Sequence, residues 1–170
     1  MSVMKDLKVE KITLNIGVGS PGDKLDKAMK LLKSITGMTP VQTITKKRIP
    51  TWGLRPNLPV ATKVTIRGKK AEQLLKRLLV AIDNKLDERK FDNFGNFSFG
   101  IPEYIDIPDV PYDAGIGVIG LEAAVTLERP GFRVKRRFVN ARKIPSRHTI
   151  KKEDAINFMK SKFNLKVGED

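Results

Sequence analysis

A glycine-rich turn near the N-terminus has the residue spacing of a nucleotide-binding loop. Gly17-Val18-Gly19-Ser20-Pro21-Gly22 matches G-x-G-x-x-G, follows an alternating apolar segment and precedes a helical one. In a dinucleotide fold such glycines let the backbone approach a pyrophosphate, and an acidic residue about 20 positions later binds the ribose. No carboxylate occurs from Gln42 to Lys70. We therefore prefer tight turns as the reason for the glycines and keep a nicotinamide-dependent enzyme as a disfavoured alternative.

Other residues suited to catalysis or metal binding are few. Three acidic side chains, Asp87, Glu88 and Asp92, would suit a divalent cation, but two basic residues lie among them, so a solvated loop is the better interpretation. The chain has no cysteine and one histidine, His148, which we expect at the surface or facing an RNA. We expect no catalytic residue, no metal ion and no cofactor.

The charge of the chain points to a polyanionic partner. The net charge is +14 and the pI is about 10.1. Gln42–Lys70 holds eight basic residues and Arg129–Lys152 holds ten, with no acidic residue in either segment, whereas Asp83–Asp113 holds eight acidic and three basic ones. A field of this sign attracts nucleic acid. A membrane is disfavoured because no apolar run approaches the roughly 18 residues of a bilayer span, and we expect a cytoplasmic protein.

Two segments combine the residue types that RNA contacts use. Thr45–Arg55 contains cations for phosphates, a glycine and the single tryptophan, Trp52, for which stacking on a base and packing within the loop are equally good interpretations. Further cations follow on an alternating strand, at Lys63 and Arg67, and in Arg133–Arg137. A solvated face explains any one of these runs, but two acid-free runs in one small protein favour RNA. A non-specific RNA chaperone remains an alternative.

Apolar periodicity predicts the elements that would position these residues. A period of two predicts strands over 9–18, 41–45, 60–67, 97–101 and 121–127. Helical spacing predicts helices over 23–35, capped near Ser20, over 71–82, and after Thr149. The order and the short connections predict one α+β domain over 1–170, with an antiparallel or mixed β-sheet, helices packed on one face, basic loops, and a basic C-terminal extension from about residue 129.

Several segments, in the same order, resemble the universal large-subunit ribosomal protein five family in its archaeal or eukaryotic form. They are VEKITLNIGVG, LLKSITGMTPVQTITKK, WGLRPN, VTIRG, GNFSFGI and VTLERPGFRVKRR, and the tail IPSRHTIKKEDAINFMKSKF is similar to the archaeal and eukaryotic members. The likeness covers nearly the whole chain, and the joint occurrence is specific where single segments are not. Ile49–Trp52 departs from a more usual stretch that has phenylalanine and no proline.

The resemblance implies a structural protein of the central protuberance, with no enzymatic activity. Its implied partners are 5S ribosomal RNA, the P-site transfer RNA, 23S-type ribosomal RNA, other proteins of the central protuberance, and small-subunit protein thirteen, met near Tyr112–Gly120. The residues expected at 5S ribosomal RNA, from motif position and from charge, are Asn15, Gly17, Lys46, Lys63, Arg67, Asn96, Ser98, Arg133 and Arg136. Those expected at transfer RNA, in the loop over residues 45–57, are Lys47, Arg48, Trp52, Gly53 and Arg55.

Overall fold

A five-stranded antiparallel sheet organises the protein. The computed structural model describes residues 3–168. The strands stand in the order β2-β3-β1-β6-β5, and each neighbouring pair is antiparallel. Their bounds are Lys8–Gly17 for β1, Val41–Ile44 for β2, Pro59–Arg67 for β3, Phe97–Ile101 for β5 and Leu121–Glu128 for β6. The predicted α+β fold and all five predicted strands are confirmed, with boundaries shifted by one residue at most.

The alternation in β1 divides the sheet into two faces. Ile12, Leu14 and Ile16 are at most 2% exposed. Between them, Thr13 and Asn15 lie on the opposite face, as alternate residues of a strand must. The neighbouring strands repeat the pattern, because residues directly opposite each other in an antiparallel pair share a face. One face is therefore apolar and buried, and the other is polar.

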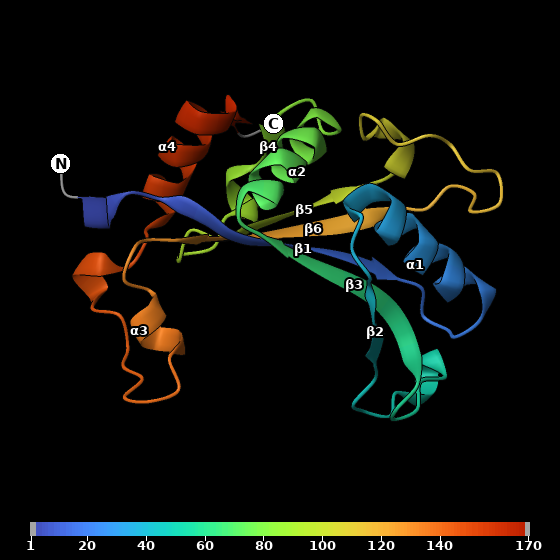
Figure 1. Ribbon diagram of the computed structural model, residues 1–170. Helices are drawn as coiled ribbons and strands as arrows, with labels where there is room; N and C mark the ends of the chain where they lie inside the picture. Colours follow the sequence, from blue (N-terminus) through green and yellow to red (C-terminus); the bar gives the residue numbers. More distant parts are fainter. Residues whose placement is uncertain (1–2, 169–170) are drawn as a thin grey trace.

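Three helices cover the apolar face (Figure 1). They are α1 (Asp23–Thr36), α2 (Lys69–Val80) and α4 (Lys152–Phe163). Each presents a row of buried apolar side chains at helical spacing, for example Leu74, Leu75, Leu78 and Leu79 on α2. Together with the inner side chains of the sheet they form the hydrophobic core.

The structure differs from the predicted elements where the chain is short or irregular. Gly22, not Ser20, is the N-cap of α1, and α2 ends at Val80. A parallel pair, β4 (Lys85–Leu86) with β7 (Lys166–Val167), was not predicted, because two residues are too few to show a period. One-turn elements complete the chain: α3 (Arg133–Arg136) and the 3-10 turns η1 (Val3–Lys5), η2 (Pro50–Trp52), η3 (Glu88–Lys90), η4 (Tyr104–Asp106) and η5 (Ser146–His148).

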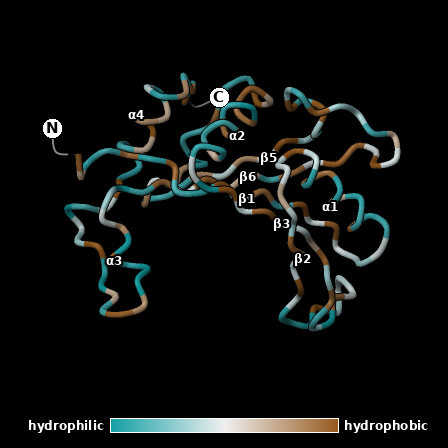
Figure 2. Tube along the Cα trace, viewed as in Figure 1, coloured by the Kyte–Doolittle hydropathy of each residue, from teal (hydrophilic) through white to brown (hydrophobic). Residues whose placement is uncertain are grey.

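Two projections extend from the sheet on the side away from α1, α2 and α4 (Figure 1). The first is the loop over residues 45–58, between β2 and β3, which contains η2. The second is the segment over residues 129–149, between β6 and α4, which contains α3 and η5. Both are largely hydrophilic along the trace (Figure 2). The two acid-free basic segments of the sequence thus supply both projections.

The turn before β5 limits what can replace Gly95. Its φ is +76°, and a Cβ there would lie 2.5 Å from Ile150 Cγ2 and 3.1 Å from Ala155 Cβ. Gly68, before α2, also has a positive φ, +70°, but has open space around it.

We therefore expect Gly95→Ala to destabilise the fold more than Gly68→Ala. Backbone strain alone should lower the free energy of unfolding by about 1–3 kcal/mol in Gly68→Ala, because its φ of +70° with ψ of −154° lies in a region that side chains disfavour. Gly95→Ala should lose a further amount of about 1–3 kcal/mol from overpacking against Ile150. Urea denaturation of both variants and the wild type measures the difference. If both variants lost the same free energy of unfolding, the turn at Gly95 would accommodate the added methyl group without any cost from overpacking.

Candidate nucleic-acid interface

The polar face of the sheet carries a group of cations on one half. The register sets Lys11 opposite Arg67 and Asn15 opposite Lys63, all pointing away from the helices. Lys63 and Arg67 are exposed, and among the described residues neither has an ion-pair partner. On its other side Asn15 lies opposite Glu122 of β6. The positive charge therefore lies toward β3.

Toward β5 and β6 this face has short side chains, apart from the carboxylates Glu122 and Glu128. Ser98 lies opposite Ala124, and Gly100 lies opposite Glu122. Gly17, at the end of β1, is exposed and has open space where a Cβ would stand. A polyanion can approach the backbone of such a surface closely, and long side chains at its margin can reach phosphates. The structure thus brings Asn15, Gly17, Lys63, Arg67 and Ser98 to one face.

Asn96 lies beside this face, in the turn that precedes β5. Its side-chain Nδ2 donates to Asp92 Oδ2 at 2.8 Å, and its backbone N–H donates to Asp92 Oδ1 at 2.7 Å. Asp92 Oδ1 also accepts from the N–H of Phe94 at 2.8 Å. The Asn96 amide oxygen is the atom of this side chain left to accept from a ligand.

Internal hydrogen bonds close the first projection. The N–H of Thr45 donates to Leu58 O at 2.9 Å, and that of Asn57 donates to Thr45 O at 2.9 Å. Nearer the tip, Ile49 and Leu54 exchange N–H···O bonds of 3.0 and 3.1 Å. Pro50 opens the one-turn η2, and Gly53, at φ +65°, ends it. The unusual Ile49–Trp52 stretch therefore builds a compact, hydrogen-bonded tip.

The side chains of this projection are presented to solvent. Trp52 is 72% exposed, which rules out the alternative that it packs within the loop. The cations Lys46, Lys47, Arg48 and Arg55 are exposed, and none of them forms an ion pair with a described residue. The structure thus brings the expected transfer-RNA residues together at one tip, with Lys46 near its base.

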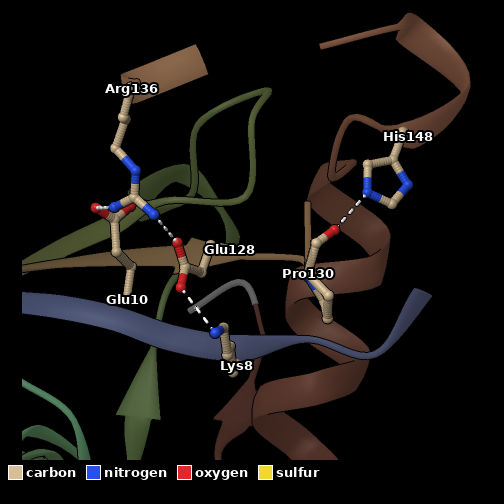
Figure 3. Close-up of polar contacts among 6 residues, drawn as sticks. All are labelled: Lys8, Glu10, Glu128, Pro130, Arg136 and His148. Carbon is tan, nitrogen blue, oxygen red and sulfur yellow. Dashed lines mark hydrogen bonds and ion pairs between the residues drawn. The ribbon is translucent and has the colours of Figure 1, made fainter. Parts of the chain in front are cut away.

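An ion-pair cluster fastens the second projection to the sheet (Figure 3). Arg136 Nη2 lies 2.6 Å from Glu128 Oε2, and its Nη1 pairs with Glu10. Lys8 Nζ lies 3.1 Å from the other oxygen of Glu128. Glu128 is 8% exposed, so it needs these cations to compensate for its lost hydration. Arg136 therefore has a structural function that its position in a basic run did not reveal, whereas Arg133 is exposed.

A second set of contacts ties the projection to α4. The Arg129 guanidinium lies 2.8 Å from Asp154 Oδ2 and donates to Thr149 O at 3.3 Å. His148 Nε2 lies 2.9 Å from Pro130 O, so this nitrogen donates (Figure 3). The His148 ring also meets Phe132 edge-on, at 5.8 Å between centroids. This half-buried ring therefore also helps to hold the projection, and the expectation that it faces an RNA stays a prediction.

The structure does not support the metal-site alternative. Residues 3–168 contain no group of three acidic or histidine side chains arranged to hold a metal ion. Asp92 accepts the three hydrogen bonds of its own turn. Glu88 Oε1 lies 2.8 Å from Lys152 Nζ, and the hydrogen bond and charge of Lys152 lower the Glu88 pKa below its ordinary value.

The glycine-rich turn also lacks the surroundings of a dinucleotide site. Its N–H groups at Val18 and Gly19 both donate to Val60 O at 2.9 Å, so they are directed at β3 and not at a phosphate. Both neighbours of β1 are antiparallel to it, whereas the fingerprint requires a parallel β-α-β unit. Gly19 and Gly22 have φ of +82° and +123°, which supports the interpretation as tight turns.

Removing the Arg136 side chain should loosen the second projection without unfolding the sheet. In Arg136→Ala the largely buried carboxylates of Glu10 and Glu128 lose a shared cation. The open state should therefore become more populated by at least the roughly fivefold that the loss of an exposed pair, about 1 kcal/mol, would give. Amide hydrogen exchange at Arg137 and Arg142 measures it, because both N–H groups bond within the projection. Arg133→Ala removes an equal charge and should leave the rates unchanged. Equal exchange in both variants would show that the cluster does not hold the segment.

Comparison with known proteins agrees with this arrangement. Residues 2–55 match the family described as "Ribosomal protein L5", and residues 59–158 match the model that describes the C-terminus of the same ribosomal family. Large ribosomal subunit protein uL5 of Nanoarchaeum equitans is 50% identical over 96% of this chain and 97% of its own. The proteins of that name from Sulfurisphaera tokodaii and Methanococcus aeolicus are 47% and 44% identical, each over 98% of this chain and 94% of its own.

These matches confirm the resemblance seen in the sequence motifs, including its archaeal character. The family is a structural part of the large subunit of the cytoplasmic ribosome and not a family of enzymes. Within residues 3–168 no helix combines the length and the apolarity that a membrane crossing needs. The two family models cover successive parts of the sequence, and both describe the same ribosomal family. The chain belongs to the ribosomal protein L5 family of the large ribosomal subunit.

Proposed function

We propose that this protein binds 5S ribosomal RNA through the polar face of its main sheet and helps to attach it in the central protuberance. One observation carries the proposal. The two acid-free basic segments extend on the side of the sheet opposite α1, α2 and α4, and the polar face lies on that same side (Figure 1). An RNA seated against this face would meet cations from the sheet and from both projections.

The proposed chemistry needs no reacting group. Lys63, Arg67 and Arg133 neutralise phosphates, and each neutralised phosphate releases condensed counterions. Asn15, Ser98 and the backbone at Gly17 offer hydrogen bonds to riboses or unpaired bases. Arg136 is 45% exposed at its side chain and positions the second projection while its outer surface adds to the field. Asn96 contributes its amide oxygen.

The first projection is proposed to contact the P-site transfer RNA. Its tip presents an exposed indole beside Lys47, Arg48 and Arg55, which suits a curved RNA surface with accessible riboses and phosphates. The hydrogen-bonded ladder at Ile49 and Leu54 holds this tip in shape before any contact forms. Less conformational entropy is then lost on binding.

The loop around Tyr112–Gly120, which lies between η4 and β6, is the third exposed segment and supports the proposed bridge to small-subunit protein thirteen. Tyr112 and Val118 are 58% and 60% exposed there. The loop is anchored by the fully buried Tyr104, whose hydroxyl accepts from the N–H of Asp113 at 3.0 Å. The same proposal gives the protein 23S-type ribosomal RNA and other proteins of the central protuberance as neighbours.

A gel-shift titration distinguishes this function from that of a non-specific RNA chaperone. Purified protein is titrated with 5S ribosomal RNA and with an unrelated RNA of equal length at several salt concentrations. A 5S binder should keep its preference at physiological salt, because shape and base contacts survive screening. If the protein binds both RNAs with equal affinity and loses both as salt is added, it acts as a non-specific polycation and not as a 5S binder.

Lys63→Ala and Trp52→Ala should separate the two RNA contacts. Lys63→Ala loses one phosphate contact, so 5S affinity should fall about five- to tenfold at low salt and the salt slope should decrease by about one. Trp52→Ala should leave 5S affinity nearly intact and lower P-site transfer-RNA binding by reconstituted ribosomes. Lys30→Ala, on the exposed side of α1, is the matched control for charge. If Lys63→Ala and Trp52→Ala lowered the affinity for 5S ribosomal RNA equally, the assignment of separate RNA contacts to the sheet face and to the first projection would be contradicted.

A further inference from the structure

The tip of the second projection exposes an aromatic side chain that the fold does not use. Phe138 is 102% exposed and its neighbour Val139 is 67% exposed. No other large apolar side chain within residues 3–168 is as exposed as Phe138. Figure 2 shows apolar colour at the far end of this projection. An isolated exposed aliphatic residue needs no explanation, but a fully exposed ring at a closed tip suggests a contact.

The hydrogen bonds that form the tip do not involve the side chain of Phe138. Arg137 Nε donates to Asn140 O at 2.9 Å, and Asn140 reverses the chain at φ +53°. The N–H of Arg142 returns to Val134 O at 3.1 Å. At the root, Arg136 is held by Glu10 and Glu128. The ring is therefore presented on a turn that is closed at its base and held at the sheet, so little conformational freedom remains to be lost on contact.

The surroundings of the ring specify RNA as the partner. Residues 129–152 contain ten basic and no acidic side chain, and Phe138 lies between Arg137 and Arg142. A protein pocket for this ring would have to accept the adjacent cations as well. An RNA provides phosphates for the cations and, wherever a base is unpaired, a flat surface for the ring.

We propose that Phe138 stacks on an unpaired base of ribosomal RNA while the flanking arginines contact its phosphates. This inference rests on the proposed RNA-binding function and adds to it a specific residue and a type of contact. Phe138 would select for unpaired nucleotides, a preference that the cations alone do not have, because phosphates occur in paired and unpaired RNA alike.

The first test compares two short RNA probes, a stem-loop with an unpaired loop and a blunt duplex of equal nucleotide number. Phe138→Ala should weaken stem-loop binding about tenfold, as expected for one base–aromatic stack, and leave duplex binding unchanged. The salt slope should stay constant, because no charge is lost. Val139→Ala, at the same tip but without a ring, is the control and should bind both probes as the wild type does.

The second test uses fluorescence. The chain has a single tryptophan, so Trp52→Phe combined with Phe138→Trp makes the tip the only tryptophan reporter. Compared with the Trp52→Phe single variant, the double variant should keep its affinity for the stem-loop if the new tryptophan stacks. Its emission should be quenched by the stem-loop but not by the duplex. Because Phe138 is outside the core, these substitutions should leave the thermal unfolding temperature unchanged.

Three results would overturn the inference. The first is equal binding of Phe138→Ala and the wild type to both probes. The second is equal quenching of the tip tryptophan by the stem-loop and by the duplex. The third is unchanged RNA binding of Phe138→Ala together with its poorer retention in large subunits, which would indicate that the ring binds a protein pocket. Failure of the proposed 5S function is distinguishable, because it would appear as a lost 5S preference in wild-type protein, whatever the residue at 138.

Discussion

The separation of apolar and polar side chains along β1 is the constraint on which the rest of the structure depends. Ile12, Leu14 and Ile16 can be buried only if Thr13 and Asn15 face the other way, because successive side chains of a strand point to opposite faces. A shift of register by one residue would expose the first set and bury the second. As β1 pairs on both edges, it imposes the same division on β3 and β6, and through them on β2 and β5.

Placing all three long helices on one side leaves the other side available for a ligand. Burial on a single face suffices for the core of a chain of this length. The uncovered face keeps short or polar side chains, and its positive charge lies toward β3. The projections then extend that surface beyond the edges of the sheet, so that residues far apart in the sequence address one side of the molecule (Figure 1).

Rigidity at the two tips comes from polar contacts and not from a core. The first projection relies on backbone ladders at Thr45 and at Ile49, and the second relies on the carboxylates of Glu10 and Glu128. A basic segment without such contacts would repel itself and lose entropy on binding. The few acidic residues near the second projection therefore organise its cations, and Arg136 and Arg129 hold it in place while their neighbours remain exposed.

The sequence by itself determined the strands, the long helices, the α+β class and the family, because apolar periods of 2 and 3.6 residues and ordered motifs are local properties. It also located both basic segments and the loop that carries Trp52. Only the tertiary structure decided that Lys63 and Arg67 share a face with Asn15, that Arg136 and His148 bind other parts of the protein, and that Phe138 remains exposed. These facts depend on which distant residues meet, as Glu10 and Arg136 do across the whole chain, and no local pattern encodes such a meeting.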